Sequence, residues 1–193
     1  MLVILGESGS GKTTLIKALT EEGSKYKRIV TYTTRPPRYG ETDGIDYHFV
    51  EEGQFHRLDK IGYFAESMNY RGWFYGISKE DCMEDGAAAV LTPHGLRTMK
   101  KLGIPTVSIY LNVDRKTRLM KMLERGDDIE EAYRRNLTDV GEFDGVSDEV
   151  DFVINNPCFM LTPENVLGIA KEILFPKKKT LDGQTCLFEG EKT

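Results

Sequence analysis

Short apolar runs alternate with amphipathic stretches along most of the chain. Runs at residues 1–5, 26–31, 86–91, 106–111 and 150–156 have the length and composition of strands. The stretches behind four of them, residues 14–20, 93–102, 114–124 and 162–174, have the apolar spacing of helices. Because strands that alternate with helices form parallel β-α-β units, the pattern predicts an α/β fold in which helices flank a central parallel β-sheet.

Local signals mark several helix boundaries. Ser78 is a suitable N-cap for a helix over residues 78–85, and Thr162 is one for the helix that closes the pattern. Prolines at positions 93 and 163 stand where a first helical turn tolerates them. A further amphipathic helix is expected over residues 51–60, ahead of an aromatic stretch at residues 62–76.

The first apolar run ends in a phosphate-binding loop motif, in which Gly6 is followed after four residues by Gly11, Lys12 and Thr13. Glycines let successive backbone N–H groups point at phosphate oxygens, and the following helix adds its free N–H groups. Lys12 can reach the β- and γ-phosphates, and the Thr13 hydroxyl can bind Mg²⁺. A plain Gly/Ser-rich turn is the alternative, but the strand before and the helix after favour the motif. The predicted ATP-binding residues are Gly6, Glu7, Ser8, Gly9, Ser10, Gly11, Lys12, Thr13 and Thr14.

A second anion site is predicted at Arg35 and Arg38, which flank two adjacent prolines. The prolines stiffen this connection because they cannot continue a helix or a central strand. Paired guanidinium groups suit a phosphate, since each can donate two parallel hydrogen bonds, and Tyr47 could add a hydroxyl donor. The alternative is a stiff surface loop whose charges are merely solvated.

This segment closely resembles the nucleoside-monophosphate-binding segment of guanylate kinases. The matching residues are 33–38, Gly40, Glu41 and 43–50, and the phosphate loop precedes them in the family's order. The resemblance extends from residue 1 to about residue 175. It implies a P-loop kinase fold with a core at 1–31, 86–124 and 144–175, a small mixed β flap that binds the nucleoside monophosphate at 32–85, a helical lid at 125–143, and an extension at 176–193.

The resemblance also implies roles for residues of the flap. Glu66 would accept hydrogen bonds from the guanine N1–H and 2-amino groups, and Tyr75 would join Tyr47 on the acceptor phosphate. The alternatives are a solvated edge-strand position for Glu66 and a core role for the aromatic residues. The predicted GMP-binding residues are Thr31, Arg35, Arg38, Tyr47, Glu66, Tyr75 and Thr92.

The stretch after residue 120 resembles the lid of these kinases. Gly126 permits a mobile turn after Arg125, and the following helix carries Arg134 and Arg135. By resemblance, Arg125 and Arg135 would neutralise charge on the transferred group, and with Lys12 they form the predicted catalytic set. An ordinary charged helix face with i,i+4 pairs is the alternative, and Arg134 stays unassigned.

Three positions depart from the family. Val90 and Thr92 replace aspartates, and Ile77 stands where a serine or threonine commonly contacts the guanine carbonyl. Such changes can alter base discrimination strongly, so another nucleotide or a phosphorylated sugar is a second possible acceptor. The presence of Glu66, which would bind a base edge, disfavours an acceptor that has no base. A non-catalytic binding module is a third possibility, which the intact phosphate loop disfavours.

Composition argues against several kinds of protein, namely membrane proteins, broad nucleic-acid binders and disulfide or zinc proteins. The 193 residues suffice for one domain, and no apolar run approaches the roughly 18 residues of a membrane helix. A net charge of −5 argues against broad nucleic-acid binding. Cys82, Cys158 and Cys186 lack metal-type spacing and are expected to be reduced thiols. Together with the resemblance to guanylate kinases, these observations predict a cytoplasmic enzyme, monomer or homodimer, that uses Mg²⁺ and ATP to phosphorylate a nucleoside monophosphate. The resemblance favours GMP or dGMP as the acceptor, and neither membrane nor nucleic-acid binding is expected.

Overall fold

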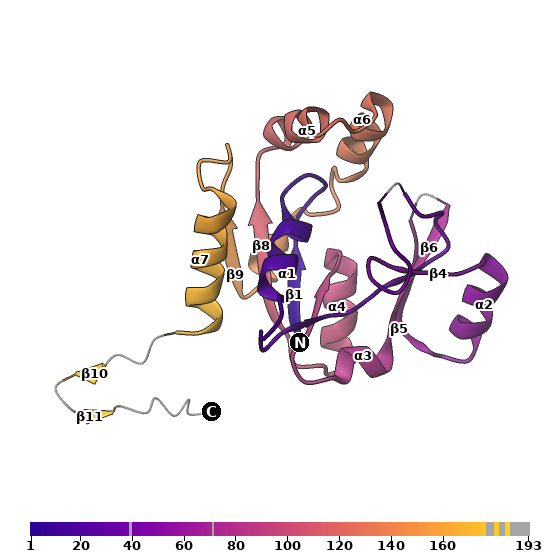
Figure 1. Cartoon of the computed structure of the whole chain (residues 1–193), viewed down its shortest axis with the longest axis horizontal. Helices are drawn as coiled ribbons and strands as arrows, with labels where there is room; N and C mark the ends of the chain where they lie inside the picture. Colours follow the sequence, from indigo (N-terminus) through magenta and orange to yellow (C-terminus); the bar gives the residue numbers. More distant parts are fainter. Residues whose placement is uncertain (39, 71, 177–179, 182–183, 186–193) are drawn as a thin grey trace.

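A five-stranded parallel sheet forms the centre of the molecule (Figure 1). The computed structural model describes residues 1–38, 40–70, 72–176, 180–181 and 184–185. The strand order is β2-β7-β1-β8-β9, and the pairs along this order are all parallel. The predicted central parallel sheet is therefore confirmed. Its strands are β1 (Leu2–Leu5), β2 (Lys27–Arg28), β7 (Ala87–Val90), β8 (Val107–Asn112) and β9 (Phe152–Asn155).

Helices cover both faces of this sheet, as the alternation of side chains along β1 requires. Leu2 and Ile4 pack in one cluster with α1 (Lys12–Leu19) and α7 (Pro163–Leu174). Val3 and Leu5 belong to a second cluster with α4 (Pro93–Lys101). The core thus holds the carboxyl end of β1, where the phosphate loop begins, between two apolar layers.

A smaller sheet of mixed direction lies beside the core (Figure 1). Its order is β4-β3-β6-β5, and α2 (Glu52–Lys60) packs on it through Phe55, whose ring stacks on Phe64 at 4.6 Å between centroids. α3 (Lys79–Met83) returns the chain to the core. The strands are β3 (Tyr32–Thr33), β4 (His48–Phe49), β5 (Phe64–Tyr70) and β6 (Trp73–Ser78).

The strand predicted over residues 26–31 was wrong in its extent. Only β2 pairs with the core sheet, and Tyr32–Thr33 pairs with β4 and β6 of the smaller sheet. Between them, Ile29 N still donates to Ala88 O, whereas Thr31 O accepts from His48 N. The chain therefore exchanges its hydrogen-bonding partners from one sheet to the other within three residues, which no apolar pattern reveals.

The predicted helix caps are confirmed. Ser78 Oγ accepts from Asp81 N at 3.3 Å, although α3 ends at Met83 rather than at residue 85. Thr162 forms a reciprocal capping box with Asn165 at the start of α7. The helix expected over residues 51–60 is present as α2.

Two helices lie at one end of the molecule (Figure 1), and the second of them, with the turn before it, belongs to the segment predicted as a lid. α5 (Arg115–Glu124) leads through a turn into α6 (Ile129–Thr138), and the short 3-10 helix η1 (Val146–Asp148) follows. Buried Asn136 ties the pair together by donating to Arg115 O at 3.2 Å. After α7, the described part of the extension holds β10 (Thr180–Leu181) and β11 (Gln184–Thr185). Within the described residues, helices long and apolar enough to span a membrane are absent.

Candidate functional site

The phosphate loop connects β1 to α1 in a backbone conformation that depends on glycine. Gly9 and Gly11 have φ values of 82° and 95°, in the left-handed region that other residues avoid. A Cβ on Gly9 would lie 2.8 Å from Arg118 O, so the loop packs closely against α5. Thr13 and Thr14 are exposed at the start of α1, where their hydroxyls are accessible to a ligand.

Lys12 points back into the loop, and its Nζ donates to Glu7 O at 2.7 Å. Burial lowers the pKa of Lys12 to about 8, although the charges of Asp139 and Glu7 partly oppose this shift. A partly buried ammonium on a phosphate loop is a strong electrostatic site for a polyphosphate.

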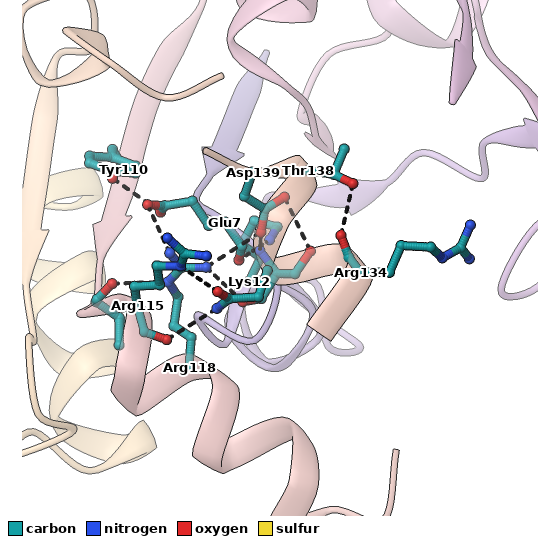
Figure 2. Close-up of polar contacts among 11 residues, drawn as sticks. Glu7, Lys12, Tyr110, Arg115, Arg118, Arg134, Thr138 and Asp139 are labelled. Carbon is teal, nitrogen blue, oxygen red and sulfur yellow. Dashed lines mark hydrogen bonds and ion pairs between the residues drawn. The ribbon is translucent and has the colours of Figure 1, made fainter. Parts of the chain in front are cut away.

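A buried polar network surrounds this loop (Figure 2). Arg118 of α5 lies 3.4 Å from both Glu7 Oε1 and Asp139 Oδ2, and its Nη1 donates to Ser8 O at 3.2 Å. Tyr110 of β8 donates its hydroxyl to the other oxygen of Glu7 at 3.1 Å. The loop is thus fixed to the sheet through Tyr110, to α5 through Arg118 and to the end of α6 through Asp139.

The arginines of the smaller sheet lie among aromatic rings and one carboxylate. Arg35 is 7% exposed, and its Nη2 donates to both oxygens of Glu41 at 2.8 Å. Burial opposes its charge, but the hydrogen bonds and charge of Glu41 outweigh burial and raise the pKa of Arg35. Its guanidinium lies 5.2 Å from the ring centre of Tyr47, which in turn packs edge-on against Tyr75 at 6.2 Å.

The lid arginines differ in their surroundings. Arg135 is half-buried and donates to Glu131 Oε1 at 2.7 Å, whereas Arg125 is exposed and paired with Asp127. Arg135 lies close enough to Arg38 to help lower the pKa of Arg38, after burial. α6 and the loop after β3 therefore bring positive charge together from segments almost a hundred residues apart.

Glu66 of β5 is directed at the first turn of α4. Its Oε2 would lie 2.5 Å from a Cβ on Gly95, so a side chain at that position would displace it. Burial raises the pKa of Glu66 to about 7. In the described part of the chain, two buried side-chain polar atoms lack a hydrogen-bond partner, and they are Glu66 Oε1 and Ser10 Oγ of the phosphate loop.

Comparison with known proteins shows the family of the chain. The family model described as guanylate kinase matches residues 1–167 of the chain. The chain belongs to the guanylate kinase family. The predicted family and its enzyme class, nucleoside monophosphate kinase, are confirmed.

Individual relatives agree with this assignment. The chain is 32% identical to a guanylate kinase of Methylobacillus flagellatus over 94% of this chain and 93% of that protein. It is 30% identical to one of Helicobacter pylori over 90% of this chain and 87% of the relative. Among solved structures, guanylate kinase from Anaplasma phagocytophilum has a TM-score of 0.66 at 22% identity, covering 90% and 84% of the two chains. Shikimate kinase from Bacteroides thetaiotaomicron reaches 0.51 at 15% identity, covering 90% and 96%, which supports the P-loop kinase fold alone.

The three departures from the guanylate kinase pattern have structural roles here. Ile77 is 2% exposed and packs in the core cluster beneath α4. Thr92 caps α4 by accepting from Gly95 N at 3.2 Å, and Val90 packs against the cluster formed by α1 and α7. Gly95 thus contacts both Thr92, whose hydroxyl accepts from its N–H, and Glu66, which lies against it. Thr31 lies at the junction of the two sheets, where its carbonyl accepts from His48 N.

Sequence reasoning missed Arg118, Asp139, Tyr110 and Glu41. Arg118 resembles the surface charges of an amphipathic helix, yet it is 4% exposed. Glu41 had a usable signal, because an acid close to two arginines in a stiff loop is a probable ion-pair partner. Cys82 and Cys158 are free thiols, as predicted, and Cys186 lies outside the described residues.

Proposed function

We propose that this enzyme transfers the γ-phosphoryl group of ATP to GMP. The observation that carries the proposal is the location of the two unpartnered buried atoms, Ser10 Oγ and Glu66 Oε1. Buried polar atoms are nearly always hydrogen-bonded, so such exceptions favour contact with a ligand. One belongs to the motif for the donor phosphates, and the other to the segment that resembles the guanine-binding segment of the family.

In this proposal the smaller sheet, residues 32–85, is the acceptor flap. Arg35 and Arg38 hold the acceptor phosphate with the hydroxyls of Tyr47 and Tyr75. Arg35 suits this role because Glu41 and the Tyr47 ring fix its guanidinium, which reduces the entropy lost on binding. Glu66 accepts from two adjacent N–H donors on the guanine edge, which requires its ionised form.

Transfer needs no general base, because the attacking phosphate oxygen of the acceptor is already anionic. Lys12 and the loop N–H groups hold the donor, and Arg135 of the lid, residues 125–143, neutralises charge on the group in transit. Arg125, which is exposed and paired with Asp127, closes over the triphosphate together with Arg135. Closure of lid and flap excludes water, which would otherwise hydrolyse ATP.

The residues present fit a magnesium ion that arrives with the nucleotide. Clusters of three or more His, Cys, Asp or Glu side chains suited to a metal are absent from the described residues. Mg²⁺ commonly keeps several waters and binds through substrate phosphates plus one or two protein oxygens, and the exposed Thr13 hydroxyl is a suitable one. When bound, the ion supplies charge neutralisation on the phosphates.

The test is ADP production from Mg-ATP with GMP, dGMP, AMP, CMP, UMP, dTMP and a ribose bisphosphate. We expect turnover with GMP or dGMP that collapses in Lys12→Ala, which affects every acceptor, and in Glu66→Ala, which affects guanine acceptors selectively. Turnover of another acceptor while guanine nucleotides are inert would refute the acceptor assignment and leave the kinase fold intact. Because Ile77 and Thr92 replace family residues, this panel also measures how much of the base preference Glu66 provides.

A further inference from the structure

Asp139 places a carboxylate directly on the phosphate loop. It follows the last residue of α6 and is 7% exposed. Its Oδ2 accepts from Ser8 N at 2.7 Å, and its Oδ1 accepts from Ser8 Oγ at 3.4 Å (Figure 2). The acidic end of the lid helix is thus bound to a backbone donor of the motif predicted to hold ATP.

The groups around this carboxylate are ones that would also bind a phosphate anion. Among the charges around Lys12, that of Asp139 favours the ammonium form most, ahead of Glu7. Asp139 accepts from a loop N–H, pairs with Arg118 at 3.4 Å and acts electrostatically on Lys12. Loop N–H groups and the loop lysine are the groups with which phosphate loops bind polyphosphates. A bound γ-phosphate would therefore meet a like charge on the donors that it needs.

Arg118, the buried cation that pairs with Asp139, has other partners besides this carboxylate. Arg118 also pairs with Glu7 and donates to Ser8 O and to Val113 O, the latter at 3.0 Å. Losing Asp139 would leave this buried arginine with a carboxylate and two carbonyl partners. The contact between Asp139 and the loop can therefore break without leaving an isolated buried charge, which would be costly.

We propose that Asp139 competes with the terminal phosphate of the donor for the phosphate loop. Donor binding then requires the end of α6 to leave the loop, one helical turn from Arg135. The carboxylate thereby lowers the affinity for the donor and links donor binding to the position of the lid. The inference rests on the donor half of the proposed function and not on the identity of the acceptor.

The decisive experiment measures binding of tripolyphosphate to the full chain by calorimetry, with no acceptor and no turnover. Asp139→Asn keeps an oxygen that can accept from Ser8 N and removes the charge. We expect it to bind tripolyphosphate about tenfold more tightly or better, as expected when a like charge a few ångströms away is removed. Asp144→Asn is the matched control because Asp144 is exposed on the same segment, and it should bind as the unaltered protein does.

A folded Asp139→Asn variant that binds tripolyphosphate with unchanged or weaker affinity would overturn the proposal. Weaker binding only when Mg²⁺ is present would overturn it as well, because the carboxylate would then be helping the metal. These outcomes do not depend on GMP turnover. An inactive enzyme with the expected binding would refute the proposed acceptor and leave this inference standing.

Hydrogen exchange in the unaltered protein provides a test that does not depend on how a variant folds. The amides of Asp139 and Val140 donate to Arg135 O and Leu137 O in the last turn of α6, and the Glu142 amide donates to Asp139 O in the turn that follows. Saturating tripolyphosphate should make this turn exchange faster, because its anchor on the loop is lost. Unchanged or slower exchange there, with the ligand bound, would contradict displacement of Asp139.

Discussion

Protonation of Glu66 should control the affinity for GMP near neutral pH. Burial raises the pKa of this carboxyl to about 7, so about half of the free enzyme is expected to carry it neutral at that pH. Only the ionised form can accept from both guanine donors. Competition with the proton then weakens GMP binding about twofold at pH 7 and about tenfold at pH 6, while the effect almost vanishes at pH 8.

Calorimetric titration with GMP between pH 6 and 8 measures this effect directly. At pH 7, binding should release about half a proton, which appears as a dependence of the heat on the buffer's ionisation enthalpy. The phosphate of GMP titrates near about pH 6 as well. The Glu66→Gln variant should keep the pH dependence that comes from the GMP phosphate and lose the proton release that comes from Glu66. A dissociation constant that varies equally with pH in both proteins would refute the reasoning.

The same carboxyl should make stability depend on pH. Its pKa in the folded chain exceeds the ordinary value of 4.5, so the folded state holds the proton more tightly than the unfolded state. The stability from this group is complete below about pH 4.5 and is lost as pH rises through about 7, by about 3 kcal/mol in all.

Glu66→Gln should remove this loss. Its melting temperature should exceed that of the unaltered protein by several degrees at pH 8, and the advantage should shrink toward pH 5. Glu22→Gln, at an exposed loop position, is the matched control and should show no such trend. A difference between Glu66→Gln and the unaltered protein that is constant from pH 5 to 8 would mean that Glu66 titrates normally.

Four further substitutions, one of them with a matched control, test the remaining roles. Lys12→Met should lower kcat/KM by about 10²-fold or more in the kinase assay without lowering the melting temperature, because it removes a buried charge. Arg135→Ala should lower kcat by about 10²-fold or more, whereas Arg134→Ala on the same helix should change it by less than about fivefold. Arg35→Lys should raise the KM for GMP and cost about 1–3 kcal/mol in urea unfolding, since Nη2 contacts Glu41 while Nη1 donates to Pro36 O at 2.7 Å, and the single nitrogen of a lysine cannot keep both contacts. Ile77→Thr should cost about 1–2 kcal/mol and leave the GMP to AMP rate ratio unchanged, because the position is in the core.

The core of the fold could be predicted because its signals are local. The β1 run, the helix behind it and the cap at Thr162 each depend on residues within one or two turns of each other. β3 could not be located in the same way, since Tyr32–Thr33 has only two residues and its partners lie up to 44 residues away. Pairing of such short strands is decided by packing of the whole flap rather than by their own pattern.

In the candidate site, too, residues of one local motif could be predicted and residues brought together from distant segments could not. The phosphate loop is one continuous motif, so each of its residues could be named in advance. Asp139 reaches Ser8 across 131 residues, and Arg118 reaches Ser8 across 110, so their roles depend on where α5 and α6 come to rest. Charged residues on amphipathic helices are usually solvated, and sequence gives no reason to expect these two to be buried.

The charges of the proposed lid and flap give a physical reason why their closure would await both substrates. Arg38 of the flap has its pKa lowered first by burial and then by the charges of Arg135 and Arg35, so these guanidinium groups repel one another. Bringing the lid toward the flap without an anion between them would increase that repulsion. Acceptor and donor phosphates would convert it into attraction, and Asp139 would hold the lid on the loop until the donor arrives. Closure over one substrate alone would then be unfavourable, which limits the loss of ATP to water.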